Sequence, residues 1–200
     1  ALFVVSPQRS FSDDEVAIVD RYIAAGGNVL LAFDPVLKNE ALAPTGFEKS
    51  LETRGILLGR DLVIEHDTAH QLPGNPGDLF LATHLGTHRL VDGIRKRGGG
   101  VLIAVARSVR TAEGSDTEVL FETSPQAVAE SNLERALNPD GQGEPTPPSA
   151  VPLAVVWEYV PPLGDDLKPV LTLYDYSDKP VAYANFAATT YDWNLMQDEH

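Results

Sequence analysis

Two pairs of histidines are the residues of this sequence best suited to metal chemistry. His66 and His70 lie four positions apart, as do His84 and His88, and Asp67 stands beside the first pair. On a helix this spacing would place both imidazoles of a pair on one face, as zinc sites use. Both pairs, however, fall in sequence typical of loops. The four histidines are therefore a candidate metal site, and the alternative that the sequence favours is solvated loop histidines.

A second candidate site consists of polar residues that follow apolar stretches. Asp34 comes directly after a stretch that ends at Phe33, Ser6 follows another, and Arg107 and Ser108 follow a third. Open α/β sheets bind ligands at the carboxyl ends of their strands, so these side chains would offer a carboxylate, hydroxyls and a guanidinium to a polyol or a small anion. The alternative, which the sequence favours, is that Asp34 ends a strand and Arg107 pairs with a surface acid.

Nucleophilic catalysis lacks its residues in this chain. The sequence has no cysteine, which excludes a thiolate nucleophile, disulfides and thiolate metal sites. A serine hydrolase needs a Gly-x-Ser-x-Gly turn, which is absent, and Ser6 is followed by Pro7. The run Gly98-Gly99-Gly100 precedes an apolar stretch, whereas a phosphate-binding loop follows a strand and opens a helix. We therefore expect a protein that is not an enzyme and that has no cofactor.

Charge and length restrict the partners further. The 200 residues include 29 acidic and 15 basic side chains, for a formal net charge of −14, and this field repels the phosphate backbone of nucleic acids. Hydrophobic residues make up 43% of the chain, enough for a substantial core. No apolar run approaches the roughly 20 residues that span a bilayer. Because the chain opens on Ala1-Leu2-Phe3 rather than on Met, we expect a piece excised from a larger protein, whose flanking segments can include a membrane anchor.

Residues 2–33 predict a strand, a helix and a second strand. Leu2–Val5 and Val29–Phe33 are continuous apolar runs, as in strands buried on both faces. Between them Ser12 and Glu15 form a capping box, and Gly26-Gly27 ends the helix. A tight return between two such strands implies that they are parallel, with a right-handed crossover.

Apolar stretches continue to alternate with helical ones along the chain. We expect helices over 45–54 and 90–96, a turn or short helix over 126–129, a flexible loop over 138–149, and strands over 56–65, 101–106, 118–123, 151–160 and 169–174. Buried strands that alternate with helices indicate an open sheet covered on both faces. The predicted fold is a flavodoxin-like three-layer α/β sandwich with a mostly parallel sheet, in a single domain that spans 1–200.

Several short motifs also follow one another in a characteristic order. They are Asp34-Pro35, Arg54-Gly55-Ile56 with Leu58-Gly59, Thr87 to Ile94, Ala106-Arg107-Ser108-Val109 and Glu122-Thr123-Ser124-Pro125. Together with the capped first helix, this order resembles the auxiliary component of ABC-type transport systems, the GldG-like group related to gliding motility. The resemblance covers the chain from Leu2 to about Pro125.

The resemblance carries its own implications. The family's fold is similar to that of class I glutamine amidotransferase domains, which is a flavodoxin-like sheet. Its members are usually soluble parts of proteins anchored in the inner membrane, located outside the cytoplasm in the periplasm, and they work with an ABC permease and an ATPase.

Three functions remain open from the sequence. The leading one is a non-enzymatic binding or scaffold domain that recognises a saccharide or a protein partner. The alternative is a degenerate amidotransferase or hydrolase relative with metal-dependent activity at His66, His70, His84 and His88. The third is a purely structural assembly module.

Overall fold

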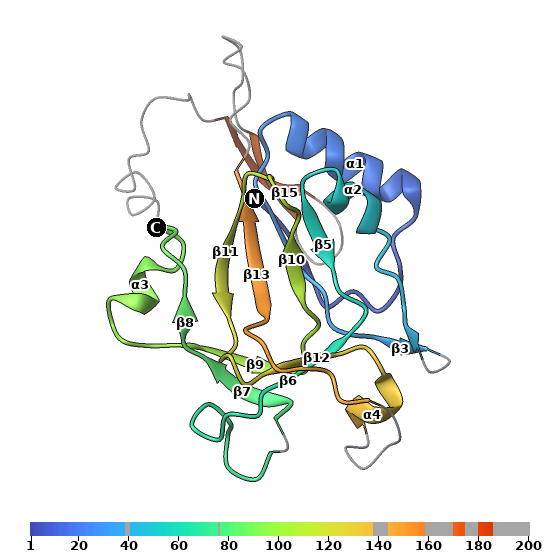
Figure 1. Cartoon of the computed structure of the whole chain (residues 1–200). Coiled ribbons are helices and arrows are strands. Elements are labelled where there is room, and N and C mark those ends of the chain that lie inside the picture. The colour runs from blue at the N-terminus through green and yellow to red at the C-terminus, as the bar shows by residue number, and fades with distance from the viewer. Residues whose placement is uncertain (39–40, 76, 138–143, 159–169, 175–179, 186–200) are drawn as a thin grey trace.

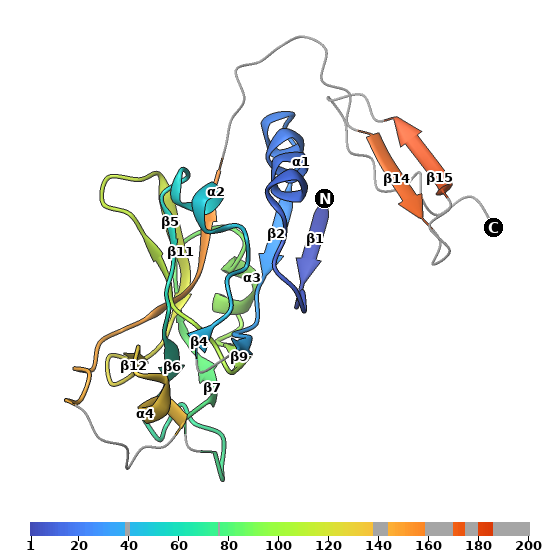
Figure 2. The same cartoon turned by 90° about the vertical axis from the view of Figure 1, so that its right-hand side faces the viewer.

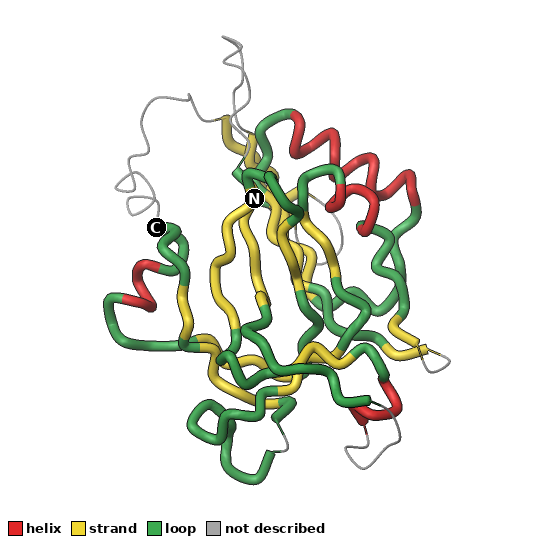
Figure 3. Tube along the Cα trace, in the orientation of Figure 1, coloured by secondary structure: helices red, strands yellow, loops and turns green. Residues whose placement is uncertain are grey.

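The computed structural model describes residues 1–38, 41–75, 77–137 and 144–158, together with the backbone of two later strands. The helices are α1 (Asp13–Ala24), α2 (Glu48–Glu52), α3 (Asp92–Arg95) and α4 (Leu133–Leu137). The strands are β1 (Leu2–Val5), β2 (Val29–Ala32), β3 (Leu37–Lys38), β4 (Ala41–Leu42), β5 (Ile56–Leu58), β6 (Leu62–Ile64), β7 (Leu79–Ala82), β8 (His84–Leu85), β9 (Val101–Ala104), β10 (Val109–Thr111), β11 (Thr117–Glu122), β12 (Val128–Glu130), β13 (Pro152–Trp157), β14 (Val170–Tyr174) and β15 (Pro180–Asn185). The four helices lie around the periphery of the strands (Figure 3).

The first strand, helix and second strand fold as the sequence predicts. β1 and β2 pair in parallel, with Leu2 opposite Val29. Helix α1 begins after Ser12, whose side chain accepts from the backbone N–H of Glu15, while the Glu15 carboxylate accepts from the Ser12 N–H at 2.9 Å. Both halves of the predicted capping box are therefore present. The sequence alone predicts this helix start, because the two residues that form the capping box lie only three positions apart.

The other strand pairs of the described residues run antiparallel. β8, β11 and β13 form one sheet, and β5–β10, β6–β12, β7–β9, β3–β4 and β14–β15 form separate pairs. Figure 1 shows β11, β13, β10 and β5 standing side by side, with β6, β7, β9 and β12 crossing below them. The flavodoxin-like sandwich stays a prediction: the described residues contain the parallel unit with which it would begin, and their remaining pairs are antiparallel.

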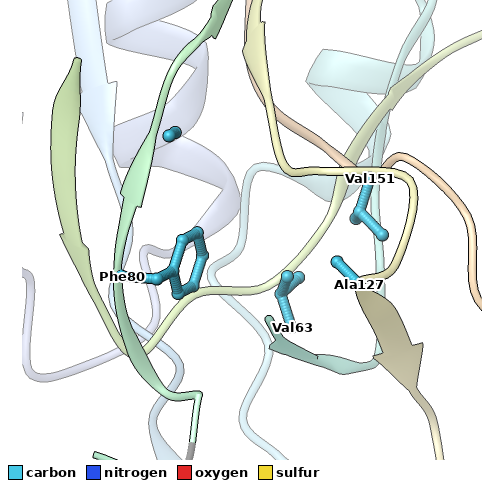
Figure 4. Packing of buried hydrophobic residues seen from close by; sticks show 5 residues of the cluster. Val63, Phe80, Ala127 and Val151 are labelled. Carbon is cyan, nitrogen blue, oxygen red and sulfur yellow. The ribbon is translucent and has the colours of Figure 1, made fainter. Parts of the chain in front are cut away.

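Two hydrophobic clusters hold the described elements together. In the first, Val16 and Val19 of α1 pack with Phe47 and Leu51, and strand residues of β1, β2 and β5 surround them. Figure 2 shows α2 between α1 and β5 accordingly. In the second, Val63, Phe80, Ala127 and Val151 meet, with Ala82, beneath the upright strands (Figure 4). Each cluster therefore joins segments that lie far apart in the sequence.

Some expected elements differ from those observed. Residues 126–129, expected as a turn or short helix, contain the start of β12, which pairs with β6. The sequence reasoning missed β7 because its four residues follow a region rich in proline and glycine, yet β7 pairs with β9 and supplies Phe80 to the core. Within the expected loop over 138–149, residues 144–149 carry no helix or strand, and 138–143 lie outside the described residues. None of the described helices combines the length and apolar character that crossing a membrane requires.

A fully buried carboxylate connects the end of β6 to the turn that precedes β12. Glu65 is 0% exposed and follows β6 directly. Its carboxylate accepts from the Ser124 N–H at 2.9 Å, from the Ser124 hydroxyl at 2.6 Å and from the Asp67 N–H at 2.9 Å. Burying a carboxylate is costly unless such donors surround it. The turn before β12 is thereby fixed against the end of β6.

Replacing this carboxylate should destabilise the domain strongly. In Glu65→Gln the new amide N–H₂ faces donors and leaves at least one of them unsatisfied, so we expect a loss of about 2 kcal/mol in the free energy of unfolding. Urea unfolding followed by circular dichroism would measure it. The control Glu118→Gln, on an exposed position of β11, should change the free energy by less than about 0.5 kcal/mol. Equal effects of the two substitutions would contradict the role given to Glu65.

Candidate functional site

The carboxyl ends of β1 and β2 bring two of the predicted site residues together. Ser6 follows β1 and Asp34 lies two residues after β2, and the Ser6 hydroxyl donates to the Asp34 carboxylate. The Gln8 side-chain amide donates to the Ser6 carbonyl oxygen at 3.0 Å and reaches the Ser6 hydroxyl at 3.3 Å. Because the two strands are parallel, their ends meet at one edge, as the sequence predicts.

Ser6 has a strained backbone at this edge. Its φ is 49°, in the left-handed region that residues other than glycine seldom adopt. The conformation is held by the hydrogen bond from the Ser6 N–H to the Ala32 carbonyl oxygen, at 2.9 Å, and by the side-chain bond to Asp34. Strain of this kind costs about 1–3 kcal/mol and is concentrated at functional sites.

A cavity of about 170 Å³ opens beside Ser6 and Asp34. Its polar wall contains the side chains of Gln8, Arg9, Ser10, Asp34, Lys38 and Thr45, and its apolar wall contains Phe33. The Asp34 carboxylate uses one oxygen for Ser6, and its other oxygen has no partner within the described part of the chain. The cavity thus offers an acceptor, donors and an apolar surface within one small volume.

Two carboxylates near this cavity, Glu15 and Glu48, are held by hydrogen-bond donors. Arg9 donates to both Glu15 oxygens, at 2.6 and 3.0 Å. This hydrogen bonding from Arg9, with further help from the Ser12 backbone N–H, lowers the pKa of Glu15 to about 2. Burial alone would raise the pKa of Glu48, but hydrogen bonds from Thr45 and Gly46 outweigh it and lower that pKa. Both carboxylates therefore remain charged and fix the segments that border the cavity.

Arg107 and Ser108 lie elsewhere and do not join this edge. Ser108 is fully buried, and its N–H and hydroxyl each donate to the Asp61 carboxylate at 2.8 Å. The Arg107 guanidinium donates twice to the Gly59 carbonyl oxygen, and burial lowers the pKa of Arg107. Neither residue is among those that line the cavity beside Asp34; both hold β10 against the turn between β5 and β6, and a ligand site shared with Asp34 stays a prediction.

The four histidines separate into different surroundings. The rings of His70 and His84 stack with their centroids 5.6 Å apart, and His70 Nε2 lies 3.9 Å from Asp67. His88 Nδ1 accepts from the Leu90 N–H, so Nε2 carries the proton and donates to Glu158 at 3.2 Å. His66 lines another cavity. Among the described residues no three histidine, aspartate or glutamate side chains are grouped to hold a metal ion.

Sequence reasoning missed most residues of the cavity wall. Gln8 and Arg9 lie in the loop after β1, Lys38 lies in β3, and Thr45 precedes α2. None of these positions has a periodic pattern or a motif that ties it to Asp34. The one available signal was Thr45 with Glu48, which repeats the spacing of a capping box and marks where the chain turns back.

The Glu15 pKa leads to a test by acid titration. A carboxylate whose pKa is depressed in the folded state stabilises it above the ordinary pKa, near 4.5, and loses that contribution as the pH falls toward 2. We expect Glu15→Gln to lower Tm at neutral pH, and the difference from the wild type to shrink from pH 4.5 downward. The control Glu113→Gln removes one exposed turn carboxylate of equal charge. A Tm difference for Glu15→Gln that persists unchanged at pH 2 would contradict the assignment.

Comparison with known proteins identifies the family. Residues 1–160, most of the chain, match the model of a family described as ABC-type uncharacterized transport system. No curated protein and no solved structure matches the chain. The resemblance inferred from the order of short motifs is confirmed at the level of the ABC transport auxiliary family, while the GldG-like group and the amidotransferase-like fold stay predictions. The chain belongs to this family of ABC-type transport system proteins.

Proposed function

We propose that this chain is a non-enzymatic binding and scaffold domain of an ABC-type transport system auxiliary protein, and that it recognises its ligand at the edge formed by Ser6 and Asp34. Membership of the transport family supports the first part. The second part rests on one observation: a strained serine and a carboxylate meet at the carboxyl ends of two parallel strands, beside a cavity. Ligand sites of open α/β sheets lie at such an edge, and the β1–α1–β2 unit is also what supports a flavodoxin-like arrangement.

The donors and acceptors of this cavity suit a saccharide or another polyol. The free oxygen of Asp34 can accept from two neighbouring hydroxyl groups, and the Gln8 amide and the Lys38 ammonium can donate. Phe33 provides the apolar surface on which the C–H face of a sugar ring packs. With a volume of about 170 Å³, below the range typical of drug-sized ligands, the cavity suits a ligand no larger than one sugar unit.

The setting follows from the family resemblance. We place the domain outside the cytoplasm, as the periplasmic part of a protein anchored in the inner membrane, in contact with the permease and ATPase subunits of its transporter or with other envelope proteins. We propose no catalytic role, because the sequence lacks both a cysteine nucleophile and a Gly-x-Ser-x-Gly turn. The metal-dependent alternative is less favoured: His70 and His84 stack on each other, but His88 pairs with Glu158 and His66 lines another cavity, and among the described residues no three possible ligands are grouped.

Ligand recognition can be tested with a small panel of polyols. We expect glucose, N-acetylglucosamine or myo-inositol to shift the backbone amide signals of Gln8, Asp34 and Thr45 in NMR titrations. Asp34→Ala should weaken such binding about tenfold, because the ligand hydroxyls lose a charged acceptor. Asp116→Ala, at an exposed position outside the cavity, is the matched control. Binding that is unaffected by Asp34→Ala, or shifts confined to other residues, would overturn the proposed site.

Association with the transporter requires a separate experiment. The full-length protein should be produced together with the permease and ATPase encoded beside it, and the complex purified through a tag on the ATPase. We expect the full-length protein to co-purify, and deletion of 1–160 to reduce its amount at equal expression. Recovery that is independent of these residues would show that the domain is not the contact to the transporter.

A further inference from the structure

A second and larger cavity lies where β6 and β12 meet α4. Its volume is about 640 Å³, within the range of roughly 300–1,000 Å³ typical of small-molecule sites. Ile64 of β6, Val128 of β12 and Ala136 of α4 contribute to an extended apolar wall, and Leu137 and Val105 border it. Such a wall can enclose the body of an apolar molecule.

Of the ionisable side chains that line this cavity, two lack a partner among the described residues. The side chains of Asp78 and His66 make no hydrogen bond or ion pair within the described part of the chain. The Glu65 N–H donates to the Gly77 carbonyl oxygen at 2.9 Å, and so holds the chain neighbours of these two residues side by side. Glu130, in contrast, is 4% exposed and lies 3.5 Å from Arg135. The unpaired acid of the cavity is therefore Asp78.

The walls of the cavity are fixed before any ligand binds. The Glu130 carboxylate accepts from the Asn132 N–H at 2.9 Å and from the Thr146 hydroxyl at 3.1 Å, which ties the start of α4 and the segment around 146 to β12. Val105 has a φ of 52° and is held there by a hydrogen bond of 2.7 Å from its N–H to the Asp78 carbonyl oxygen. A positive φ is especially unfavourable for a β-branched residue. The strain lies beside the unpaired carboxylate.

We propose that this cavity binds a small cationic amphiphile, with its apolar body against Ile64, Val128 and Ala136 and its ammonium group at Asp78. The charge favours a cation: Arg135, which also lines the cavity, offsets the charge of Glu130, so that Asp78 leaves an excess of one negative charge, and the whole chain carries a net charge of −14. An anionic head group placed beside Asp78 would meet repulsion from its carboxylate. This site is separate from the Ser6–Asp34 edge and does not depend on the function proposed for that edge.

Three matched probes test the proposal on the 200-residue chain. 4-Phenylbutylamine has the apolar body and the ammonium group, 4-phenylbutyrate has the same body with a carboxylate, and n-butylamine has the ammonium without the ring. We expect the first to shift the NMR amide signals of Val128 and Ala136 saturably. The carboxylate should bind at least about fivefold more weakly, and n-butylamine about tenfold more weakly. Equal binding of amine and carboxylate, or no shifts at these residues with millimolar amine, would overturn the proposal.

Two surface substitutions, Asp78→Asn and Leu137→Lys, make the test specific, because neither removes a core residue, and each has a matched control. Asp78→Asn should weaken 4-phenylbutylamine binding about three- to fivefold, whereas Asp116→Asn should not change it. Leu137→Lys places a positive charge at the rim and should weaken the amine but not the carboxylate. Leu90→Lys, at a leucine exposed to a similar degree (62% against 65%), is its control. Wild-type affinity for the amine in both Asp78→Asn and Leu137→Lys would contradict the site. Asp34→Ala, which alters the first cavity, should leave amine binding unchanged, so the two proposals can fail independently.

Discussion

The described structure depends on buried carboxylates that each bind both donors of a single serine. Glu65 accepts from the N–H and the hydroxyl of Ser124, and Asp61 accepts from the N–H and the hydroxyl of Ser108. The two acids flank β6, so the strand is tied at one end to β10 and at the other to the turn before β12. Both carboxylates are almost entirely withdrawn from water, at 0% and 3% exposure. The antiparallel pairs cannot separate without leaving these charges without donors. Gly59 makes the approach possible, since a methyl group there would overlap Ser108 and Asp61.

The same arrangement recurs at the start of two helices. Glu15 accepts from the N–H and the hydroxyl of Ser12, and Glu48 accepts from those of Thr45. A carboxylate has about four lone-pair sites, and the N–H and hydroxyl of one residue can satisfy two of them with little additional loss of chain entropy. At the helix starts the acid lies three residues after its partner, whereas around β6 the partners lie 47 and 59 residues apart. One interaction therefore serves both as a local cap and as a long-range link.

This difference in separation explains what the sequence could and could not predict. The capping box of α1 and the two strands around it were predictable because every signal is local, and the meeting of Ser6 and Asp34 followed from the parallel direction of those strands. No local pattern indicates that Asp61 binds Ser108. Arg107-Ser108 and Thr123-Ser124 were recognised as family motifs, and the structure shows that their serines are buried structural residues. A strand of three residues such as β12 is equally hard to predict, because its hydrogen bonds to β6 decide its conformation.

Strained backbone conformations and cavities occur at the same two places in this fold. Among the described residues, the two residues other than glycine with a positive φ are Ser6 and Val105. Each directly follows the end of a short strand, and a cavity lies at each place. A sharp change of direction after a strand exposes the strand end and keeps the following segment from covering it. Such a conformation persists only where the surroundings compensate for its cost. At Ser6 the compensation comes from the bond to Asp34, and at Val105 from the bond to Asp78 and from the fixed position of β6. The hydrogen bonds that stabilise the fold therefore also hold the two cavities open.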